Sequence, residues 1–318
     1  MKTCRFGIIG AGNIANHFCN AVKWIGDAEV AAVASTSAER AAAFAKKNGI
    51  GRAYGSYEQM LQNEDINIVY IATTHNFHKE NILLCLAHGK HVLCEKAMVL
   101  TAADAREVFA AAKERGLFCM EAMWSRFLPQ YQTARKWITS GRIGTVQSAS
   151  VSIGFRADPN PAGRILNPDL AGGAMYDIGV YAIEIMTYLI GEPVTDCVGL
   201  WRAHPVTGVD ERLSVILRFP SCDGVLQCAI SGNAKEYVIV NGSDGVIEIP
   251  FVTGGHKLRL LHGDRNVAEE FEEDWENGFV YEIREVIRCI REGKTCSETM
   301  PPEATIECAE IFDKVLRS

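Results

Sequence analysis

The sequence has little that suits a secreted, membrane-spanning or nucleic-acid-binding protein. No apolar run is long enough to cross a bilayer, and Met1–Cys4 leads directly into a predicted strand rather than a signal peptide. The formal net charge of -7 argues against a nucleic-acid surface. None of the eleven cysteines forms a C-x-x-C pair, the repeated short spacing of zinc and redox motifs. We therefore expect no metal, and reduced, mostly buried thiols in a cytoplasmic protein.

Length and composition indicate a globular chain with about two domains. Of the 318 residues, 48% are hydrophobic and 22% are charged, as in ordinary globular proteins. A chain of this length forms about two domains, each with its own core. The sequence has no long repeats and no low-complexity segments, so the domains are located from local patterns.

The most informative stretch is a glycine-rich turn, Gly10-Ala11-Gly12-Asn13-Ile14-Ala15. It lies between an apolar run at residues 4–9 and a predicted helix over 14–24, a context typical of dinucleotide binding. We expect Gly10 to allow the tight turn, Gly12 to let the backbone approach a pyrophosphate, and Ala15 to keep helix and strand close. The backbone N–H groups that begin the helix, at Asn13 and Ile14, then suit the phosphates.

Residues 1–122 are predicted to form a nucleotide-binding domain. Strand and helix patterns alternate there, with strands at 29–34, 66–72, 91–94 and 117–120 and helices at 38–47, 76–87 and 101–115. Repeated strand–helix units imply a doubly wound parallel sheet of the Rossmann type. Ligands of such sheets bind beyond the carboxyl ends of the strands.

Residues 123–318 follow a different pattern and are predicted to form an α+β domain. Helices at 129–140 and 175–190 accompany strand patterns at 146–154, 194–203, 213–219, 224–231, 236–241, 245–249 and 258–261. Turn signals separate these strands, which is typical of a mostly antiparallel sheet. Two helices, at 277–291 and 302–316, close the chain. We therefore expect an α/β protein with its active site in the cleft between the two domains.

The end of the second predicted strand indicates which cofactor binds. NAD sites usually place a carboxylate there, where it binds the ribose diol. This chain has Ser35 and Thr36 instead, and Arg40 lies one helical turn further on. These side chains can donate to a 2′-phosphate, so NADP is predicted, with NAD as the alternative. Under that alternative, Ser37 merely caps the next helix and Arg40 is a solvated surface charge.

Two further segments carry side chains suited to acid–base chemistry. Glu95-Lys96 follows the strand at 91–94, at a carboxyl end where ligands bind. Asp177 and Tyr181 lie four residues apart in the first turns of the apolar helix, so they share one face of it. A carboxylate and a phenol facing a cleft can handle a hydroxyl proton beside a cofactor. Alternatively, Glu95-Lys96 is a solvated pair, Asp177 satisfies the helix start and Tyr181 belongs to the core.

Four segments in order resemble the glucose–fructose oxidoreductase/inositol dehydrogenase (Gfo/Idh/MocA) family. They are the glycine turn at 10–15, Thr73-Thr74-His75 with His78, the run from Gly89 to Lys96, and Gly172-Gly173 through Asp177 to Tyr181. The segments at 120–127, 207–210 and 282–294 are most similar to the branch of dimeric dihydrodiol dehydrogenases and NADP-dependent D-xylose dehydrogenases. Ala97 departs from the family's Glu-Lys-Pro. Alanine rarely takes the cis peptide bond that proline can hold, because a non-proline cis bond costs ~3 kcal/mol.

The resemblance implies hydride transfer between a nicotinamide and a carbinol carbon, with Lys96, Asp177 and Tyr181 as catalytic residues. Tyr181 takes or returns the hydroxyl proton, and Lys96 stabilises the phenolate, because free tyrosine has a pKa of about 10. Lys96 and Tyr181 can exchange these roles. Asp177 orients the substrate hydroxyl or Lys96.

The resemblance also implies which residues contact the cofactor and the substrate. The cofactor contacts beyond the glycine turn and second strand are Thr73, Thr74, His75, His78, Glu95 and Lys96. The candidates for the substrate pocket are Trp124, Arg126, Phe155, Arg164 and Phe279. Aromatic faces suit pyranose rings and cyclic diols alike, but each of these residues can equally be ordinary packing. A histidine at a helix start, likewise, is often structural.

Three functions follow from these observations. The first is an NADP-dependent oxidoreductase acting on a cyclic polyol, namely an aldose, an anhydro-ketose or a trans-dihydrodiol. The second is an NAD-dependent inositol or sugar-phosphate dehydrogenase, and the third is a non-catalytic NADP-binding sensor, against which Lys96, Asp177 and Tyr181 argue. A mostly antiparallel sheet with helices on one face leaves the other face to cover. We therefore expect a homo-oligomer, a dimer through that sheet.

Overall fold

The computed structural model describes residues 3–63, 65–263 and 266–317, so Met1 and Lys2 ahead of the first strand lie outside the described residues. The chain divides into two compact units. Unit 1 comprises Met1–Val99, Ala103–Trp124 and Asn277–Thr305, and unit 2 comprises Leu100–Ala102, Ser125–Glu276 and Ile306–Ser318. The predicted division after residue 122 did not include the return of residues 277–305 to unit 1. This return occurs because α8 (Phe279–Arg291) packs against α1 (Asn13–Val22).

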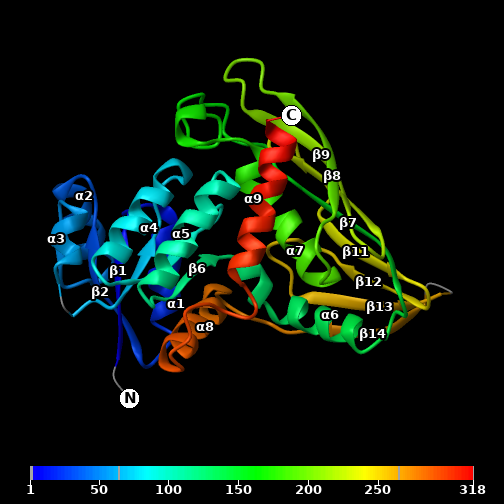
Figure 1. Ribbon diagram of the computed structural model, residues 1–318, viewed down its shortest axis with the longest axis horizontal. Coiled ribbons are helices and arrows are strands. Elements are labelled where there is room, and N and C mark those ends of the chain that lie inside the picture. The colour runs from blue at the N-terminus through cyan, green and yellow to red at the C-terminus, as the bar shows by residue number, and fades with distance from the viewer. Residues whose placement is uncertain (1–2, 64, 264–265, 318) are drawn as a thin grey trace. The chain divides into compact units, whose positions relative to one another are not determined.

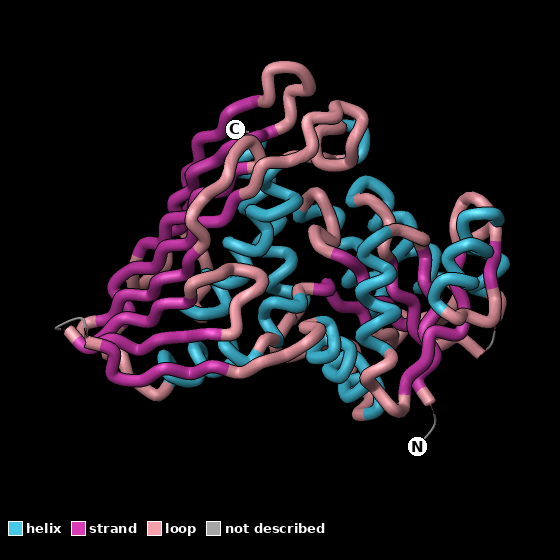
Figure 2. The backbone as a smooth tube through the Cα atoms, turned by 180° about the vertical axis from the view of Figure 1, so that it is seen from behind, coloured by secondary structure: helices cyan, strands magenta, loops and turns pink. Residues whose placement is uncertain are grey.

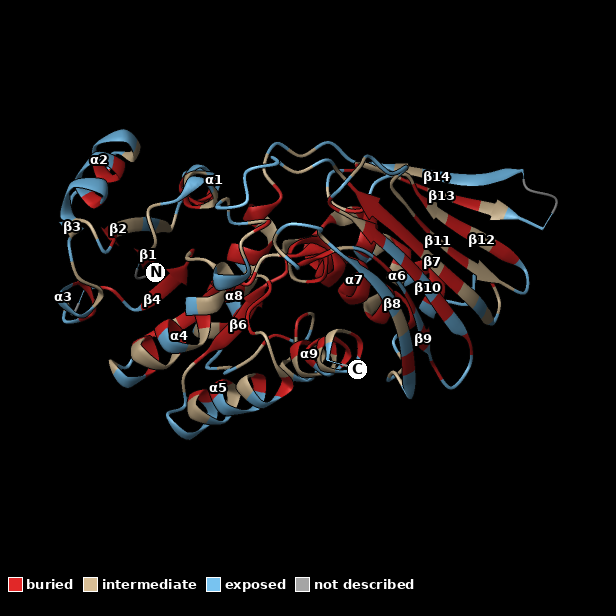
Figure 3. Ribbon diagram, turned by 90° about the horizontal axis from the view of Figure 1, so that it is seen from above, coloured by how far each residue is buried: buried red, intermediate tan, exposed pale blue. Residues whose placement is uncertain are grey.

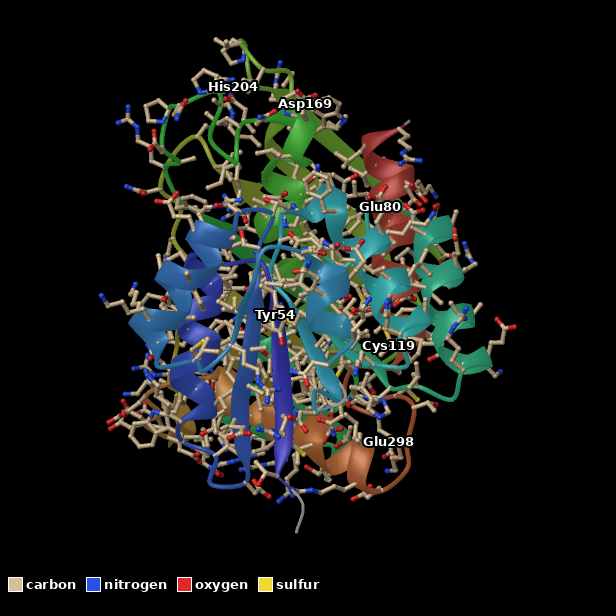
Figure 4. The ribbon with its side chains drawn as sticks, turned by 90° about the vertical axis from the view of Figure 1, so that its left-hand side faces the viewer. Tyr54, Glu80, Cys119, Asp169, His204 and Glu298 are labelled. Atoms are coloured by element: carbon tan, nitrogen blue, oxygen red, sulfur yellow. The ribbon has the colours of Figure 1, made fainter. Side chains whose placement is uncertain are left out.

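Unit 1 contains a six-stranded, all-parallel sheet in the order β3-β2-β1-β4-β5-β6. Its strands are β1 (Cys4–Ile9), β2 (Ala28–Ala34), β3 (Ala53–Tyr54), β4 (Ile68–Ile71), β5 (His91–Glu95) and β6 (Cys119–Ala122). The order runs outward from β1 in both directions, which is the doubly wound Rossmann arrangement that the sequence predicted. Tyr54 on edge strand β3 and Cys119 on the opposite edge strand β6 are labelled in Figure 4.

Helices cover both faces of this sheet. Besides α1 and α8 they are α2 (Ala38–Asn48), α3 (Tyr57–Leu61), the 3-10 turn η1 (His75–Phe77), α4 (His78–Ala87) and α5 (Ala102–Glu114). The 3-10 turn η2 (Trp124–Phe127) follows β6, where the chain passes into unit 2. Helices α4 and α5 lie on one side of the sheet and α1 on the other (Figures 1 and 3). Helix α1 forms here because its apolar residues, including Ala15 and Phe18, fall on one buried stripe.

Unit 2 contains an eight-stranded sheet in the order β14-β13-β12-β11-β7-β10-β9-β8. Its strands are β7 (Val146–Gly154), β8 (Asp196–Ala203), β9 (Asp210–Arg218), β10 (Asp223–Ala229), β11 (Tyr237–Gly242), β12 (Gly245–Ile249), β13 (Lys257–His262) and β14 (Val267–Glu272). Strands β7 and β10 pair in parallel and the other pairs are antiparallel, so the predicted mostly antiparallel sheet is confirmed.

The helices of unit 2 lie on one face of its sheet. Figure 2 shows no helix of the described residues on the other face. The helices of the unit are α6 (Pro129–Thr139), the 3-10 turn η3 (Pro168–Leu170), the π-helix η4 (Met175–Gly179), α7 (Val180–Ile190) and, from residue 306 onward, α9 (Pro302–Leu316). The predicted single helix over 175–190 is therefore corrected: it begins as a π-helix and becomes α-helical only at Val180. Such π segments often occur at functional sites.

Two observations bear on the cellular setting. All eleven cysteines are free thiols, ten of them buried and Cys296 partly exposed, which confirms the predicted buried, unpaired state. None of the helices within the described ranges is long and apolar enough to cross a membrane.

Candidate active site

The glycine turn lies between β1 and α1, and its two glycines are needed for different reasons. Gly10 has a φ of +101°, and a Cβ there would lie 2.7 Å from the Ala72 carbonyl oxygen, so the fold itself requires glycine. Gly12 has an ordinary extended backbone, with a φ of -95°, and a Cβ there would meet only the Ala72 oxygen at 3.9 Å. No other described atom comes close to Gly12, so the fold itself does not require glycine at this position.

The start of α1 suits a phosphate. Gly12 and Asn13 are exposed, Ile14 is half-buried, and Ala15 is buried. The first turn of α1 carries no acidic residue, and its N-cap Gly12 provides no side chain. The N–H groups of this first turn therefore remain available to an anionic group. These residues are therefore compatible with a pyrophosphate, and their role as cofactor contacts stays a prediction.

Hydroxyl groups and one guanidinium gather where β2 ends. Ser35 is buried, whereas Thr36 and Arg40 are exposed. Arg40 Nη2 donates to Thr36 Oγ1 at 2.8 Å, and Ser37 Oγ accepts from the Arg40 N–H at 3.2 Å, which caps α2. The predicted cap at Ser37 is thus present, and Arg40 is also held beside the two hydroxyls. The cluster offers donors to a phosphate ester.

The segment after β4 is joined to the segment after β5 by a buried histidine. His78 is fully buried, and its Nε2 lies 3.1 Å from the Thr73 oxygen while its Nδ1 lies 2.9 Å from the Ala97 oxygen. Burial lowers the pKa of His78, and hydrogen bonds to the two carbonyls only partly offset this effect. The structure gives His78 a bridging role instead of the predicted direct cofactor contact, because both ring nitrogens face backbone carbonyls.

The neighbours of His78 also lie at this carboxyl edge. Thr73 and Thr74 are half-buried, and His75 is buried with its ring 5.7 Å from that of His78. Thr73 Oγ1 accepts from Asn81 Nδ2 at 3.2 Å, which fixes the threonine from α4. Thr73 and Thr74 therefore stay candidates for cofactor contact.

Glu95 ends β5 as a buried carboxylate. The hydroxyl of Tyr70, on the neighbouring strand β4, donates a short hydrogen bond to Glu95 Oε1. Burial, followed by the charge of Glu95, raises the pKa of Tyr70 far above its usual range, so Tyr70 is a permanent donor. The pair fixes the carboxylate just before Lys96.

The Lys96 segment is held on both sides by buried groups. Met98 N donates to Glu121 Oε1 at 2.9 Å, and the Ala97 oxygen faces His78. The Lys96–Ala97 peptide bond is cis, contrary to the expectation drawn from the replacement of the family's proline by alanine. Lys96 itself is half-buried. Two buried side chains thus hold the segment that carries Lys96.

An aromatic stack lies at the start of α8. Trp124 stacks on Phe279 with ring centroids 5.6 Å apart, and Phe279 stacks on His17 at 6.5 Å. Trp124 follows β6 and is half-buried, whereas Phe279 is buried. The structure thus brings together two of the five predicted substrate residues, 155 positions apart in the chain, and places both in unit 1.

In unit 2, Asp177 lies in the π-helix η4 and is buried. Arg164 Nη1 donates to Asp177 Oδ1 at 2.8 Å, and the Arg164 side chain is 51% exposed. Tyr181, in the first turn of α7, is also buried. Arg164 thus combines a fixed contact to a buried carboxylate with an exposed guanidinium, which suits a substrate contact.

The double glycine positions the Arg164 loop. The Gly173 N–H donates to the Ile165 oxygen at 2.9 Å, and the Gly172 N–H donates to the Asn167 oxygen at 3.0 Å. A Cβ on Gly172 would lie 2.5 Å from the Ile165 oxygen, so only glycine lets the loop pack this closely. The loop therefore begins directly against the segment that carries Asp177.

Arg126 is corrected from a substrate contact to a structural residue. Its Nη2 lies 2.6 Å from Glu184 Oε2 and 3.0 Å from Thr187 Oγ1, and its side chain is almost completely buried. Burial raises the pKa of Glu184, and the Arg126 charge opposes that rise. Phe155, the remaining predicted substrate residue, follows β7 and is half-buried.

The sequence patterns indicated no role for three buried polar residues, two of them in unit 1 and one in unit 2. Tyr70 is the hydroxyl within the apolar strand β4, a visible signal that was not used. Asp210 accepts from the Met175 N–H at the start of η4, and Glu282 on α8 is fully buried near Glu95. Both lay in segments noted only for their resemblance to the family. Among the described residues no group of three or more His, Cys, Asp or Glu side chains is arranged to hold a metal ion.

The parallel sheet, the open glycine turn and the polar strand ends define a dinucleotide-binding oxidoreductase. Residues 4–123 match the family model described as "Oxidoreductase family, NAD-binding Rossmann fold", and residues 131–248 match the "GFO/IDH/MocA C-terminal domain". The chain belongs to the Gfo/Idh/MocA family of NAD(P)-dependent oxidoreductases, and the resemblance drawn from the motifs is confirmed.

Individual relatives agree with this placement. The chain is 35% identical to mouse (Mus musculus) trans-1,2-dihydrobenzene-1,2-diol dehydrogenase, covering 99% of this chain and 96% of the relative. Its fold is similar to that of aldose-aldose oxidoreductase from Caulobacter crescentus, solved with glycerol, with a TM-score of 0.91, 25% identity and coverage of 99% and 97%. Its fold is also similar to that of the 3-ketoreductase KijD10 from Actinomadura kijaniata, solved with NADP and TDP-benzene. The TM-score is 0.90 at 25% identity, and the match covers 99% of this chain and 98% of that structure.

Proposed function

We propose that this chain is an NADP-dependent oxidoreductase that acts on the carbinol or carbonyl carbon of a cyclic polyol. The observation that carries the cofactor preference is the cluster after β2, where Arg40 is bonded to Thr36 beside Ser35. An NAD site usually has a carboxylate here, which binds the ribose diol and would repel a 2′-phosphate. In this chain, the hydroxyls and the guanidinium stand in its place. The 3-ketoreductase solved with NADP supports the same choice.

The cofactor preference is tested on α2, where Arg40 lies in the first turn and Lys46 in the last. We expect Arg40→Ala to raise the KM for NADP⁺ by about 10-fold to 100-fold, since a charged hydrogen bond contributes about 1.5–3 kcal/mol. The KM for NAD⁺ should stay unchanged, and the control Lys46→Ala should change neither value. Equal effects of Arg40→Ala on both cofactors would show that Arg40 is only a surface charge.

We assign the proton chemistry to Tyr181, Lys96 and Asp177. The Tyr181 phenol oxygen takes the substrate hydroxyl proton in oxidation and returns it in reduction. The Lys96 ammonium stabilises the phenolate and the developing alkoxide by its charge. Asp177, held by Arg164, orients the hydroxyl. Bound NADP supplies the hydride acceptor or donor.

Each role is tested beside a matched control substitution, at Tyr176 for Tyr181 and at Lys113 for Lys96. Tyr181→Phe should lower kcat by about 10²-fold to 10⁴-fold, the range for general acid–base groups, whereas Tyr176→Phe should leave kcat nearly unchanged. Lys96→Ala should abolish turnover while NADPH binding persists, whereas the exposed Lys113→Ala should not. Unaffected turnover in Lys96→Ala would overturn the assignment. In the oxidation direction, the residual activity of Tyr181→Phe should lose the ionisation that limits the rate on the acidic side of the pH profile, because a proton acceptor must be deprotonated to act.

The proposed substrates are aldoses, anhydro-ketoses and trans-dihydrodiols. The mouse relative is named for a trans-dihydrodiol and the Caulobacter relative for aldoses. The half-buried Trp124, which stacks on the buried Phe279, is the aromatic side chain that we expect to contact either ring type. Reduction of NADP⁺ should be followed by absorbance across aldopyranoses, anhydro sugars and cyclic trans-diols, with NAD⁺ in parallel. Turnover with NADP⁺ fixes the class, whereas silence with retained NADPH binding would favour a non-catalytic sensor.

We also propose that two copies of the chain associate through the open face of the unit 2 sheet. Val198, Ile216 and Val225 lie side by side on β8, β9 and β10 and are 62%, 43% and 42% exposed. A continuous apolar row of this kind marks an interaction surface, and a two-fold dimer would cover it on both copies. Light scattering should give a dimer that Ile216→Asp dissociates and that Trp24→Asp, in unit 1, does not. A monomer in the unchanged chain would refute the proposal.

Because its thiols are free and mostly buried, we infer a reducing, cytoplasmic location. Fractionation that finds the protein only outside the cytoplasm would contradict this inference.

A further inference from the structure

We propose that Asp210 is a positioning residue that holds the start of η4, and with it Asp177, in the geometry needed for turnover. Asp210 is the first residue of β9 and is buried. Its Oδ2 accepts from the Met175 N–H at 2.6 Å, across 35 positions of sequence. This inference rests on the proposed catalytic roles of Asp177 and Tyr181.

Asp210 performs the capping that the helix itself lacks. The residue before η4 is Ala174, which has no side-chain acceptor for the first N–H groups of the helix. The carboxylate supplies that acceptor, and its negative charge suits the positive end of the helix dipole. Burial raises the pKa of Asp210 to about 7, against hydrogen bonds from Met175 and Ala174 that lower it.

Gly173 makes the approach of this carboxylate possible. Its φ is +121°, and a Cβ added to it would collide with Asp210 Oδ1. The same glycine donates its N–H to Ile165, in the loop that carries Arg164. Asp210 therefore lies where the helix start and the Arg164 loop meet.

Two paths lead from this junction to the proposed reacting groups. Asp177 lies two residues after Met175 and its N–H donates to the Gly173 oxygen at 3.2 Å. Arg164, from the adjoining loop, holds the Asp177 carboxylate at 2.8 Å. Loosening the cap therefore shifts Asp177 from both directions. Since a displacement of about 1 Å at a reacting group can cost on the order of 10²-fold in rate, the expected effect falls on kcat.

The test is a double-mutant cycle of Asp210→Ala, which removes the acceptor that asparagine would keep, and Asp177→Asn, with the exposed Asp169→Asn (labelled in Figure 4) as control. Asp210→Ala should lower kcat roughly 10-fold to 100-fold, whereas its KM for NADP⁺ should match that of the D169N control. In the Asp177→Asn background, the same change should lower kcat by less than about twofold, because the group it positions is already lost.

The possible outcomes separate this inference from the proposed function. Full additivity of the two changes, with a large effect of Asp177→Asn, would overturn the positioning role of Asp210 alone. An unchanged kcat in Asp177→Asn would overturn the proposed role of Asp177 and this inference with it. If Asp210→Ala does not fold, Asp210→Ser, which removes the charge with a smaller side chain, takes its place in the cycle.

Discussion

Substituting Gly12 by alanine should separate cofactor binding from folding. The backbone at Gly12, with φ -95° and ψ -175°, is open to any residue, and the nearest atom to an added Cβ is the Ala72 oxygen at 3.9 Å. Alanine restricts the unfolded chain, which stabilises by about 0.4–1 kcal/mol. It is also a poorer N-cap than glycine, by a similar amount. The two terms offset each other, so the free energy of unfolding should change by less than about 1 kcal/mol.

Cofactor binding should respond much more strongly to the same methyl group. It would stand where the pyrophosphate approaches the first N–H groups of α1. Losing one charged hydrogen bond costs about 1.5–3 kcal/mol, which corresponds to roughly a 10-fold to 100-fold higher Kd. NADPH should be titrated by protein fluorescence, and thermal unfolding measured without cofactor.

Two other glycines serve as controls for Gly12→Ala. Gly10→Ala should unfold more easily by about 2 kcal/mol or more, because its positive φ and the Ala72 oxygen at 2.7 Å both oppose a side chain. Gly26→Ala, which has no atom within 4 Å of the added Cβ, should change neither stability nor binding. The reasoning is refuted if Gly12→Ala binds NADPH as tightly as the unchanged protein, or if it unfolds like Gly10→Ala.

Three further predictions concern buried charges. Arg126→Met should lower the free energy of unfolding by about 3 kcal/mol, because the buried Glu184 carboxylate then lacks its arginine partner. Adding Glu184→Leu should recover part of that loss in denaturant unfolding. A raised substrate KM at unchanged stability would instead restore Arg126 as a substrate contact. Burial, followed by the charge of Glu95, raises the pKa of Glu282 well above its usual range. The unchanged protein should therefore lose stability relative to Glu282→Gln as the pH rises, because the buried carboxyl must ionise and the amide does not; a stability difference that does not change with pH would contradict the raised pKa. The pKa of Asp210 rises from 3.8 to about 7 on folding, so the folded state holds this proton where the unfolded state has lost it. The free energy of unfolding that Asp210 contributes therefore falls as the pH rises through this window, by at most about 4 kcal/mol. The stability difference between Asp210→Asn and the unchanged protein should shift in favour of the variant between pH 4 and 7, and a difference independent of pH would disprove it.

Local patterns predicted most elements because each carried its own signal. The strands at 146–154 and 245–249 and the helix at 302–316 have the bounds expected from apolar periodicity and turns. Strand β14 was missed because it is a mostly exposed, acidic edge strand without alternation. Strand β3 has only two residues, too few for any period.

The candidate site was predictable to the extent that chemistry is visible in residue type. The glycine turn, the hydroxyls after β2 and the pair Asp177 and Tyr181 lie at the ends of elements, where the sequence pattern places them. The role of Arg126 was not predictable, because its position two residues after a tryptophan says nothing of Glu184, 58 residues away. A guanidinium has the same sequence signal whether it faces a substrate or a buried carboxylate.

By itself, the sequence determined the doubly wound nucleotide domain, the antiparallel second sheet and the kind of chemistry at the strand ends, because periodicity, turns and helix starts are set by neighbouring residues. Only the tertiary structure decided that residues 277–305 return to unit 1, that His78 bridges two loops and that Asp210 caps η4. These are partnerships between distant segments. They depend on which polar groups are buried together, since a buried polar group must find its partner wherever the fold places one.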